Sequence, residues 1–255
     1  MRRLLLVACL ALAACTPSPP EEDAGAPTTP PPTTAASAAP TEDPALEPAC
    51  PNEVAVVADE SLQTAGEISG DVDGDGTDES VTIFFDRAGE DGCQAFVVAR
   101  SGEEIAAAGP LETWRSDFGL PMPTLNSLRE VDGEPGLEVV VNMGAGASTQ
   151  FVGIVTAEGG ALRQVTSDVP DQAGEGLFGV GGSVGHLEAV DCADDGRLVA
   201  SFAAPAGAKY RVERRFLVFR GTELVADEVE VERVRIERLN DFPEYAAAPF
   251  GSCSD

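Results

Sequence analysis

Beyond residue 50 the hydrophobic positions fall into short runs, which are rich in valine, isoleucine, threonine and phenylalanine and are separated by glycine-containing turns. Only the stretch 111–118 could form one or two helical turns. The predicted strands are 65–68, 80–85, 94–100, 104–107, 138–142, 150–156, 161–165, 197–202, 209–219 and 223–225. A longer alternating strand, 228–239, is predicted to complete the sheet with 53–58. The pattern therefore predicts an all-β protein.

The pattern repeats with a period of about 59 residues, since Asp73, Asp132 and Asp191 are each 59 positions apart. In each unit a short strand and a loop precede an apolar strand, and two further strands follow. This order predicts a four-stranded antiparallel blade or meander, repeated about three times. A closed propeller normally has at least four blades. We therefore expect a small or incomplete β-propeller-like fold, with a rolled β-barrel or a sandwich of the same hairpins as the alternative.

The loop of the first unit carries acidic residues at alternating positions. Asp71, Asp73 and Asp75 stand at positions 1, 3 and 5, and Glu79 closes the loop at position 9. Oxygen ligands at this spacing can converge on a point about 2.3–2.6 Å from each, which suits a hard cation such as Ca²⁺. Gly76 supplies the positive φ that turns the loop back around the ion. We predict a metal site here, and an ordinary acidic surface turn is the alternative.

The type of calcium loop follows from the flanking residues. An EF-hand needs a glutamate at position 12 and a helix on each side, but position 12 is Thr82, within a predicted strand. A loop of this kind between two strands resembles the nine-residue calcium loop of FG-GAP/VCBS-type repeats, although that family usually has aspartate where Glu79 stands. The resemblance implies a structural calcium ion, with other ligands bound elsewhere on the domain. The ion ligands that it implies are the side chains of Asp71, Asp73, Asp75 and Glu79 and the carbonyl of Thr77.

The second and third copies of the loop depart from the motif. In the second, Pro135 replaces the glycine of position 6, and its ring holds φ negative, so the same turn is not available. Whether this second loop binds a cation stays open at this stage. In the third copy Ala189, Ala193 and Arg197 occupy ligand positions, so we expect no cation there. The candidate ligands of the second loop are Glu130, Asp132, Glu134 and Glu138.

The segment 1–14 has the features of a signal peptide, because Arg2 and Arg3 precede an apolar run that is too short for a stable membrane span. Leu-Ala-Ala-Cys at 12–15 resembles a bacterial lipobox, which implies cleavage before Cys15 and lipidation of its thiol; ordinary cleavage near Ala14 and release is the alternative. Residues 15–49 contain ten prolines and are predicted to be a disordered linker. The folded domain, 50–255, would then be tethered at the extracytoplasmic face of a membrane.

Four cysteines remain in the predicted domain, and an even number in an exported protein suggests two disulfides. The cysteines are Cys50, Cys93, Cys192 and Cys253. Of the three possible pairings we favour Cys50–Cys93 with Cys192–Cys253, which closes the shorter loops. A bond between Cys50 and Cys253, which would join the two ends of the domain, is the main alternative.

The composition argues against several classes of function. A formal charge of −28 with a single lysine, Lys209, disfavours binding to nucleic acid or to an anionic lipid surface. The sequence Gly-Gly-Ser-Val-Gly at 181–185 matches the nucleophile-elbow pattern, but His186 is the only histidine and is too close in sequence to complete a triad. We therefore assign no catalytic residue. The basic residues from 209 to 238 alternate with glutamates and are predicted to form cross-strand ion pairs, with a patch for an anionic ligand as the alternative.

Together these patterns predict a non-enzymatic, membrane-anchored lipoprotein. Its calcium-binding β-repeat module would interact with a protein or a glycan at the cell surface. A cell-envelope hydrolase is one alternative, and it would require a pocket with convergent polar groups. A purely structural envelope lipoprotein is the other.

Overall fold

The structure, a computed structural model, describes residues 63–85, 95–111, 123–168, 176–183 and 185–254. All of these residues belong to one compact unit, Leu46–Asp255. The predicted signal peptide, Cys15, the linker, the strand at 53–58, the turns at 112–118, Cys50 and Cys93 lie outside the described residues. None of the described helices is long and apolar enough to cross a membrane.

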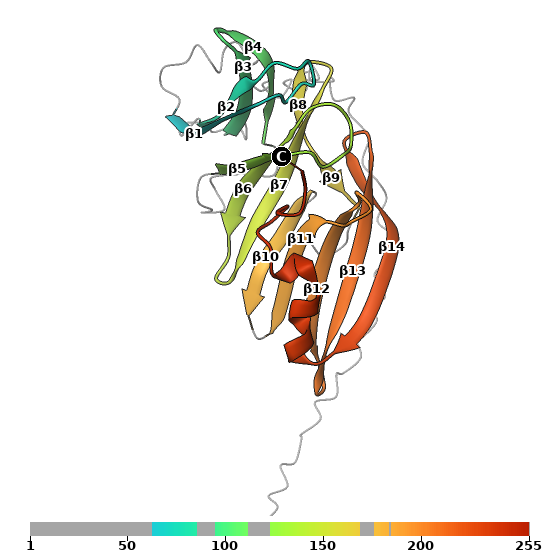
Figure 1. The fold of residues 1–255 in the computed structure, drawn as a ribbon. Helices are drawn as coiled ribbons and strands as arrows, with labels where there is room; N and C mark the ends of the chain where they lie inside the picture. The colour runs from blue at the N-terminus through green and yellow to red at the C-terminus, as the bar shows by residue number, and fades with distance from the viewer. Residues whose placement is uncertain (1–62, 86–94, 112–122, 169–175, 184, 255) are drawn as a thin grey trace, which may run out of the picture. The chain divides into compact units, whose positions relative to one another are not determined.

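The described chain confirms the all-β prediction, and twelve of its strands form three antiparallel meanders of four strands each (Figure 1). The first meander is β1 (Gln63–Gly70), β2 (Glu79–Phe85), β3 (Ala95–Ser101) and β4 (Glu104–Pro110). The second is β5 (Thr124–Arg129), β6 (Glu138–Ala145), β7 (Thr149–Glu158) and β8 (Ala161–Gln164). The third is β11 (His186–Cys192), β12 (Leu198–Ala206), β13 (Lys209–Arg220) and β14 (Glu223–Val234). The short β9 (Thr166–Ser167) and β10 (Leu177–Ser183) lie between the last two meanders.

The three meanders are hydrogen-bonded into one mixed sheet that is not closed into a barrel. The sheet branches at β7, whose one edge pairs with β6 while its other edge pairs with β10 along 149–153 and with β8 along 155–158. Parallel pairing of β4 with β8 and of β9 with β14 completes the sheet. The described strands thus form neither separate propeller blades nor a closed barrel.

The second meander lies between two hydrophobic cores. Val139 and Val141 of β6 pack in a core with β2, β3 and β4, whereas Val140 packs with β10 to β14. Side chains alternate between the two faces of a strand, so a strand that is covered on both faces needs apolar residues at every position. This explains the uninterrupted run of valines in β6, all of which are fully buried.

A third core lies under the C-terminal segment, where one strand prediction was wrong. The predicted strands 223–225 and 228–239 are a single strand, β14, which ends at Val234. The chain continues in two 3-10 helices, η2 (Ile236–Asp241) and η3 (Pro243–Tyr245). Leu239 and Phe242 leave the strand path because they pack against Val212 and Val234. An alternating pattern alone does not reveal this change of direction.

Gly109 in β4 tests how tightly the first meander is joined to the second. A Cβ atom at this position would collide with the backbone carbonyl of Leu162 in β8, and backbone cannot move aside as a flexible side chain can. We expect Gly109→Ala to lower the free energy of unfolding by about 2–4 kcal/mol in urea titrations.

Gly146→Ala is the matched control for this substitution. A Cβ atom there would meet only ordinary contacts, the nearest being 3.6 Å from the carbonyl oxygen of Thr149. We expect a change of less than about 0.5 kcal/mol. Equal effects of the two substitutions would show that the close approach of β4 to β8 is not a constraint on folding.

Candidate metal centre

The acidic loop joins β1 to β2 and is folded by its own carboxylates. Asp71 accepts the backbone N–H of Gly74 through Oδ1 (2.8 Å) and that of Gly76 through Oδ2 (2.9 Å). Asp73 accepts the N–H of Asp75 at 3.1 Å. Gly74 and Gly76 have φ values of 75° and 87°, which glycine adopts without strain. The loop is therefore curled around its first aspartate.

Three carboxylates converge inside this loop. Asp71, Asp73 and Glu79 each offer one oxygen, and these oxygens lie within 4.8 Å of one another. Glu79 is fully buried. Its Oε2 accepts the N–H of Val72 (3.0 Å), while its Oε1 has no hydrogen-bond partner. A buried carboxylate oxygen without a partner is costly unless a cation or a proton satisfies it, so the residues present fit a bound metal ion.

The electrostatics of the loop also favour a bound cation. Burial raises the pKa of Glu79 above its ordinary value, and the negative charges of Asp73 and Asp75 raise it further. The bond from the N–H of Val72 opposes this shift without cancelling it. A divalent cation would reverse the effect, because it stabilises the charged form of every carboxylate around it.

The structure brings together three of the five predicted ligands. Asp75 is exposed, and its carboxylate accepts the N–H of Thr77 at 2.7 Å instead of joining the group of three. Thr77 is also exposed in the same loop. The hydrogen bond from the N–H of Val72 to Glu79 could not be predicted from the motif. Its only signal in the sequence is the glutamate at position 9, which is longer than the usual aspartate.

The second loop, between β5 and β6, repeats this architecture one period later in the chain. Glu138 is paired with Arg129 as Glu79 is with Gly70, and its Oε2 accepts the N–H of Val131 at 2.7 Å. The positive φ that Pro135 cannot adopt is found one residue later, at Gly136 (φ 116°). Within the described residues, however, the first loop holds the only group of three such carboxylates. The structure thus does not bring Glu130, Asp132, Glu134 and Glu138 together as ligands.

Glu138 is buried without two further carboxylates of described residues beside it. It is 4 % exposed. Burial, with Asp132 adding to the effect, raises the pKa of Glu138 to about 7.

The two loops lie back to back. The N–H of Leu137 donates to the carbonyl oxygen of Asp71 at 2.8 Å. A Cβ atom at Gly74 would collide with the carbonyl of Pro135, and one at Gly136 would be 3.0 Å from the carbonyl of Val72. Pro135, which breaks the motif in the second loop, therefore lies directly against Gly74 of the first loop.

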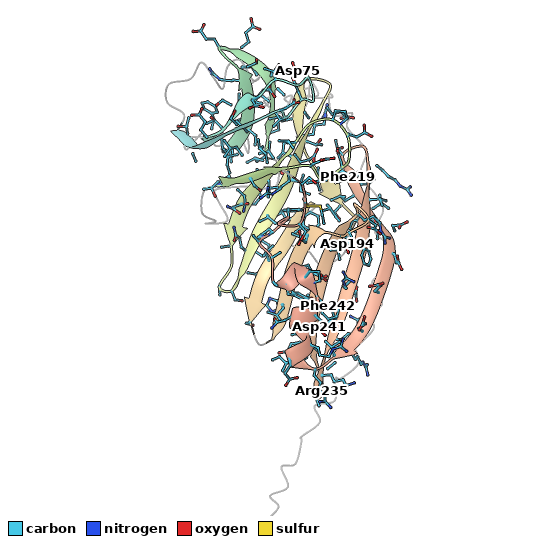
Figure 2. All side chains as sticks on the ribbon, viewed as in Figure 1. Asp75, Asp194, Phe219, Arg235, Asp241 and Phe242 are labelled. Carbon is cyan, nitrogen blue, oxygen red and sulfur yellow. A yellow bond between two sulfur atoms is a disulfide. The ribbon has the colours of Figure 1, made fainter. Side chains whose placement is uncertain are left out.

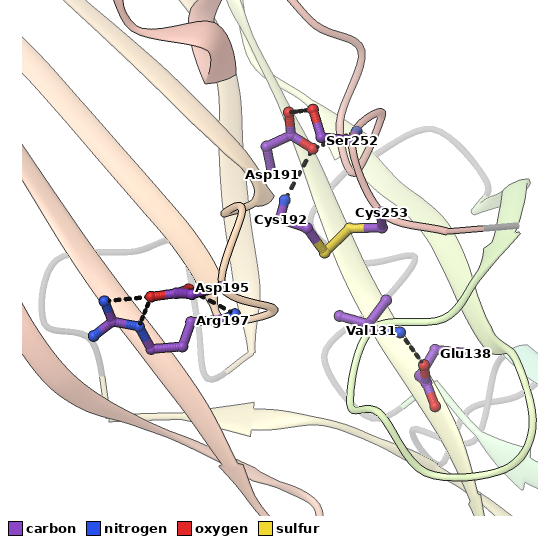
Figure 3. The surroundings of a disulfide bond; sticks show 8 residues. All are labelled: Val131, Glu138, Asp191, Cys192, Asp195, Arg197, Ser252 and Cys253. Carbon is purple, nitrogen blue, oxygen red and sulfur yellow. Dashed lines mark hydrogen bonds and ion pairs between the residues drawn. A yellow bond between two sulfur atoms is a disulfide. The ribbon is translucent and has the colours of Figure 1, made fainter.

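The third copy does not form a loop of this kind (Figure 3). Asp191 is a buried member of β11, paired with Val199, and it accepts the N–H (2.7 Å) and the hydroxyl (2.8 Å) of Ser252. Cys192 and Cys253 form a disulfide beside it, which is one half of the favoured pairing and excludes a bond between Cys50 and Cys253. The equal spacing of the three aspartates therefore corresponds to a shared structure only in the first two copies.

Gly181, Gly182 and Ser183 of the nucleophile-elbow sequence are the last residues of β10 and pair with β11. The hydroxyl of Ser183 accepts the N–H of Gly185 (3.2 Å), while Nε2 of His186 faces the hydroxyl of Thr149 (3.2 Å) and a carboxylate oxygen of Glu188 (3.5 Å). These contacts do not form a Ser-His pair. Comparison with protein-family models, with curated proteins and with solved structures found no match.

The pKa of Glu138 predicts a pH dependence of stability. The folded pKa of about 7 is above the ordinary value of 4.5, so between these values the folded state binds more protons than the unfolded state. Stability must then fall as pH rises through this window, by up to roughly 3 kcal/mol. Glu138→Gln retains an acceptor for the N–H of Val131 and should remove this contribution. In urea titrations with chelator, we expect the free energy of unfolding of the variant to increase relative to that of the wild type from about pH 5 to about pH 8.

Glu130→Gln is the control, because Glu130 belongs to the same loop but is exposed. The free energies of unfolding of this variant and of the wild type should differ by the same amount across the same pH range. A parallel pH profile for Glu138→Gln and the wild type would contradict the prediction.

Proposed function

We propose that the protein is a membrane-anchored extracytoplasmic lipoprotein whose β-domain is stabilised by calcium and serves as an interaction module for a protein or a glycan at the cell surface. The single observation that carries the calcium proposal is the unpartnered, fully buried Oε1 of Glu79, next to the carboxylates of Asp71 and Asp73. A cation gives this oxygen the partner that no protein group supplies.

The choice of calcium among metal ions rests on the donor atoms. The loop 71–79 offers only oxygen, from four aspartates, one threonine and one glutamate, and contains neither histidine nor cysteine. Oxygen donors suit the hard cations, and Ca²⁺ accepts a larger and less regular set of ligands than Mg²⁺. Asp71, Asp73 and Glu79 would hold the ion through carboxylates, and Asp75 and Thr77 are the additional ligands that the resemblance to FG-GAP/VCBS-type repeats implies.

The role of the ion in this proposal is structural. It would neutralise charges that otherwise repel one another within a single turn, and so hold the β1–β2 hairpin closed. The carbonyl of Asp71 accepts the N–H of Leu137, so closure of the first loop also fixes its contact with the second. A rigid domain edge of this kind suits a binding module, and no catalytic step is assigned to the ion.

The repeat and the anchor belong to the same proposal. Two hairpins one period apart have the same pairing, Gly70 with Glu79 and Arg129 with Glu138, and they support an origin of the meanders as copies of one FG-GAP/VCBS-type unit. In this view the copies have been joined into an open sheet instead of a propeller. The lipobox at 12–15 and the linker up to residue 49 support a lipid anchor at Cys15.

Calcium titration tests the proposal directly. Extracellular sites commonly bind with Kd of 10⁻⁴–10⁻³ M, so about 5 mM calcium should stabilise the protein by roughly 1–2 kcal/mol and raise Tm by several degrees over the value in chelator. Asp73→Asn removes one charge and should abolish the shift. Asp132→Asn makes the same change at the matching position of the second loop and should retain it. An equal Tm with and without calcium in the wild type would refute the site.

Calcium binding should also displace protons. Because the pKa of Glu79 is raised, protons compete with the ion for its carboxylate, and the affinity for calcium should rise with pH. Isothermal titration near pH 6, in buffers of different ionisation enthalpy, should show heats that differ between buffers because protons are released. Identical heats in all buffers, with an affinity that does not change up to about pH 7.5, would place the ion away from Glu79.

A further inference from the structure

The basic residues of the chain are concentrated in one strand pair. Eight of the sixteen lysines and arginines lie between 209 and 238. Ion pairs occupy several of them, with Arg211 and Arg215 bound to Glu213 and Arg214 bound to Glu230. Those with no ion pair to any described residue are Lys209, Arg220, Arg233 and Arg235. Three of these four lie at the same end of β13 and β14.

The strand register brings like charges together at this end. Arg211 of β13 is directly opposite Arg233 of β14, and like charges in this position repel one another. Glu213 balances Arg211, whereas Arg233 has no ion pair to a described residue. Lys209 precedes Arg211 by two residues, and Arg235 follows Arg233 by two. Lys209 and Arg235 line one cavity of about 400 Å³. Figure 2 shows Arg235 at the end of the third meander. The nearby carboxylates include Glu213 beside Arg211, Glu188 opposite Phe202, and Glu237 on the cavity wall.

Exposed hydrophobic residues lie on the neighbouring strands and at the cavity. The four large ones among the described residues are Phe202 (43 % exposed), Val229 (52 %), Val231 (50 %) and Ile236 (57 %). Phe202 is opposite Glu213, which is opposite Val231, so they form one row across β12, β13 and β14. Residues two apart on a strand share a face, so Val229, Val231 and Arg233 point the same way. Ile236 lines the cavity with Lys209 and Arg235.

We propose that this basic tip, formed by the four cations Lys209, Arg211, Arg233 and Arg235 with Phe202, Val229, Val231 and Ile236, docks the domain on an anionic lipid bilayer. Cations beside exposed apolar side chains fit the boundary between lipid phosphates and acyl chains. This partner goes beyond the proposed function and does not depend on the lipid anchor or on the calcium loop.

The charge of the whole chain does not oppose this contact. At physiological salt, exposed charges more than about 8–10 Å from the membrane are screened. The charge at the contact surface therefore decides the interaction, whatever the sum of −28 over the chain. The glutamates of β14 that alternate with its valines lie on the opposite face, where Glu230 binds Arg214.

Sedimentation with vesicles tests the proposal. The full chain carrying Cys15→Ser, which cannot be lipidated there, is mixed with vesicles of phosphatidylcholine alone or with about 30 % phosphatidylglycerol. Chelator is present so that calcium cannot bridge acidic loops to lipid phosphate. We expect binding to the anionic vesicles only, weakening with salt. The charge reversals Lys209→Glu and Arg235→Glu together should reduce the affinity at least about tenfold.

Matched variants separate this site from general charge effects. Arg220→Glu removes an exposed cation at the other end of β13, one that also has no ion pair to a described residue, and should change the affinity less than about twofold. Should the double reversal unfold the domain by circular dichroism, Lys209→Gln with Arg235→Gln replaces it, with a loss of about fivefold expected. Val229→Ser with Val231→Ser should weaken the binding that remains at high salt.

Three results would overturn the proposal. The first is equal binding of the wild type to neutral and anionic vesicles. The second is an equal loss of affinity for Arg220→Glu and for the double reversal. The third is binding to a soluble polyanion such as heparin without binding to vesicles, which would make the basic tip a site for a soluble partner. None of these results depends on whether calcium binds at 71–79 or whether Cys15 is lipidated.

Discussion

A buried glutamate that closes a hairpin loop is the interaction on which this structure depends. Glu79 and Glu138 each end a loop and enter a strand, and each accepts the N–H of the residue seven positions earlier. Burying a carboxylate in this way fixes the loop but makes its negative charge costly. The two loops meet this cost differently. Converging carboxylates around Glu79 suit a cation, whereas burial raises the pKa of Glu138 to about 7, which favours its neutral form below that pH.

The two acidic loops are held together by close backbone contacts. Pro135 removes the turn that the motif requires, but its carbonyl lies where Gly74 of the first loop has no side chain. Leu137 in turn donates to the carbonyl of Asp71, a predicted ion ligand. The second loop therefore contributes to the order of the first through backbone contacts.

The sequence predicted local structure well wherever one face of a strand, or a compact motif, controlled the pattern. The apolar strands and the first acidic loop follow from residue pattern and spacing. Loop length favoured the pairing of Cys192 with Cys253 but left a bond between Cys50 and Cys253 open. β10 was missed because four of the residues from 177 to 183 are glycine or serine. The branching of the sheet at β7 could not be predicted, because it depends on which edges meet after folding. Asp191 shows the limit of periodicity, since its spacing matches the motif but its strand register does not.

Charge shows the same distinction between composition and arrangement. A chain with a formal charge of −28 predicts a surface that avoids anions. The strand register nevertheless places Arg211 opposite Arg233, while the glutamates of β14 face the other side and hold Arg214. Alternation along β14 thus places Arg233 and the glutamates from 228 to 232 on opposite faces, because odd and even positions cannot share a side. Since screening confines each face to its own surroundings, an acidic protein can carry a surface suited to anions without any change in its total charge.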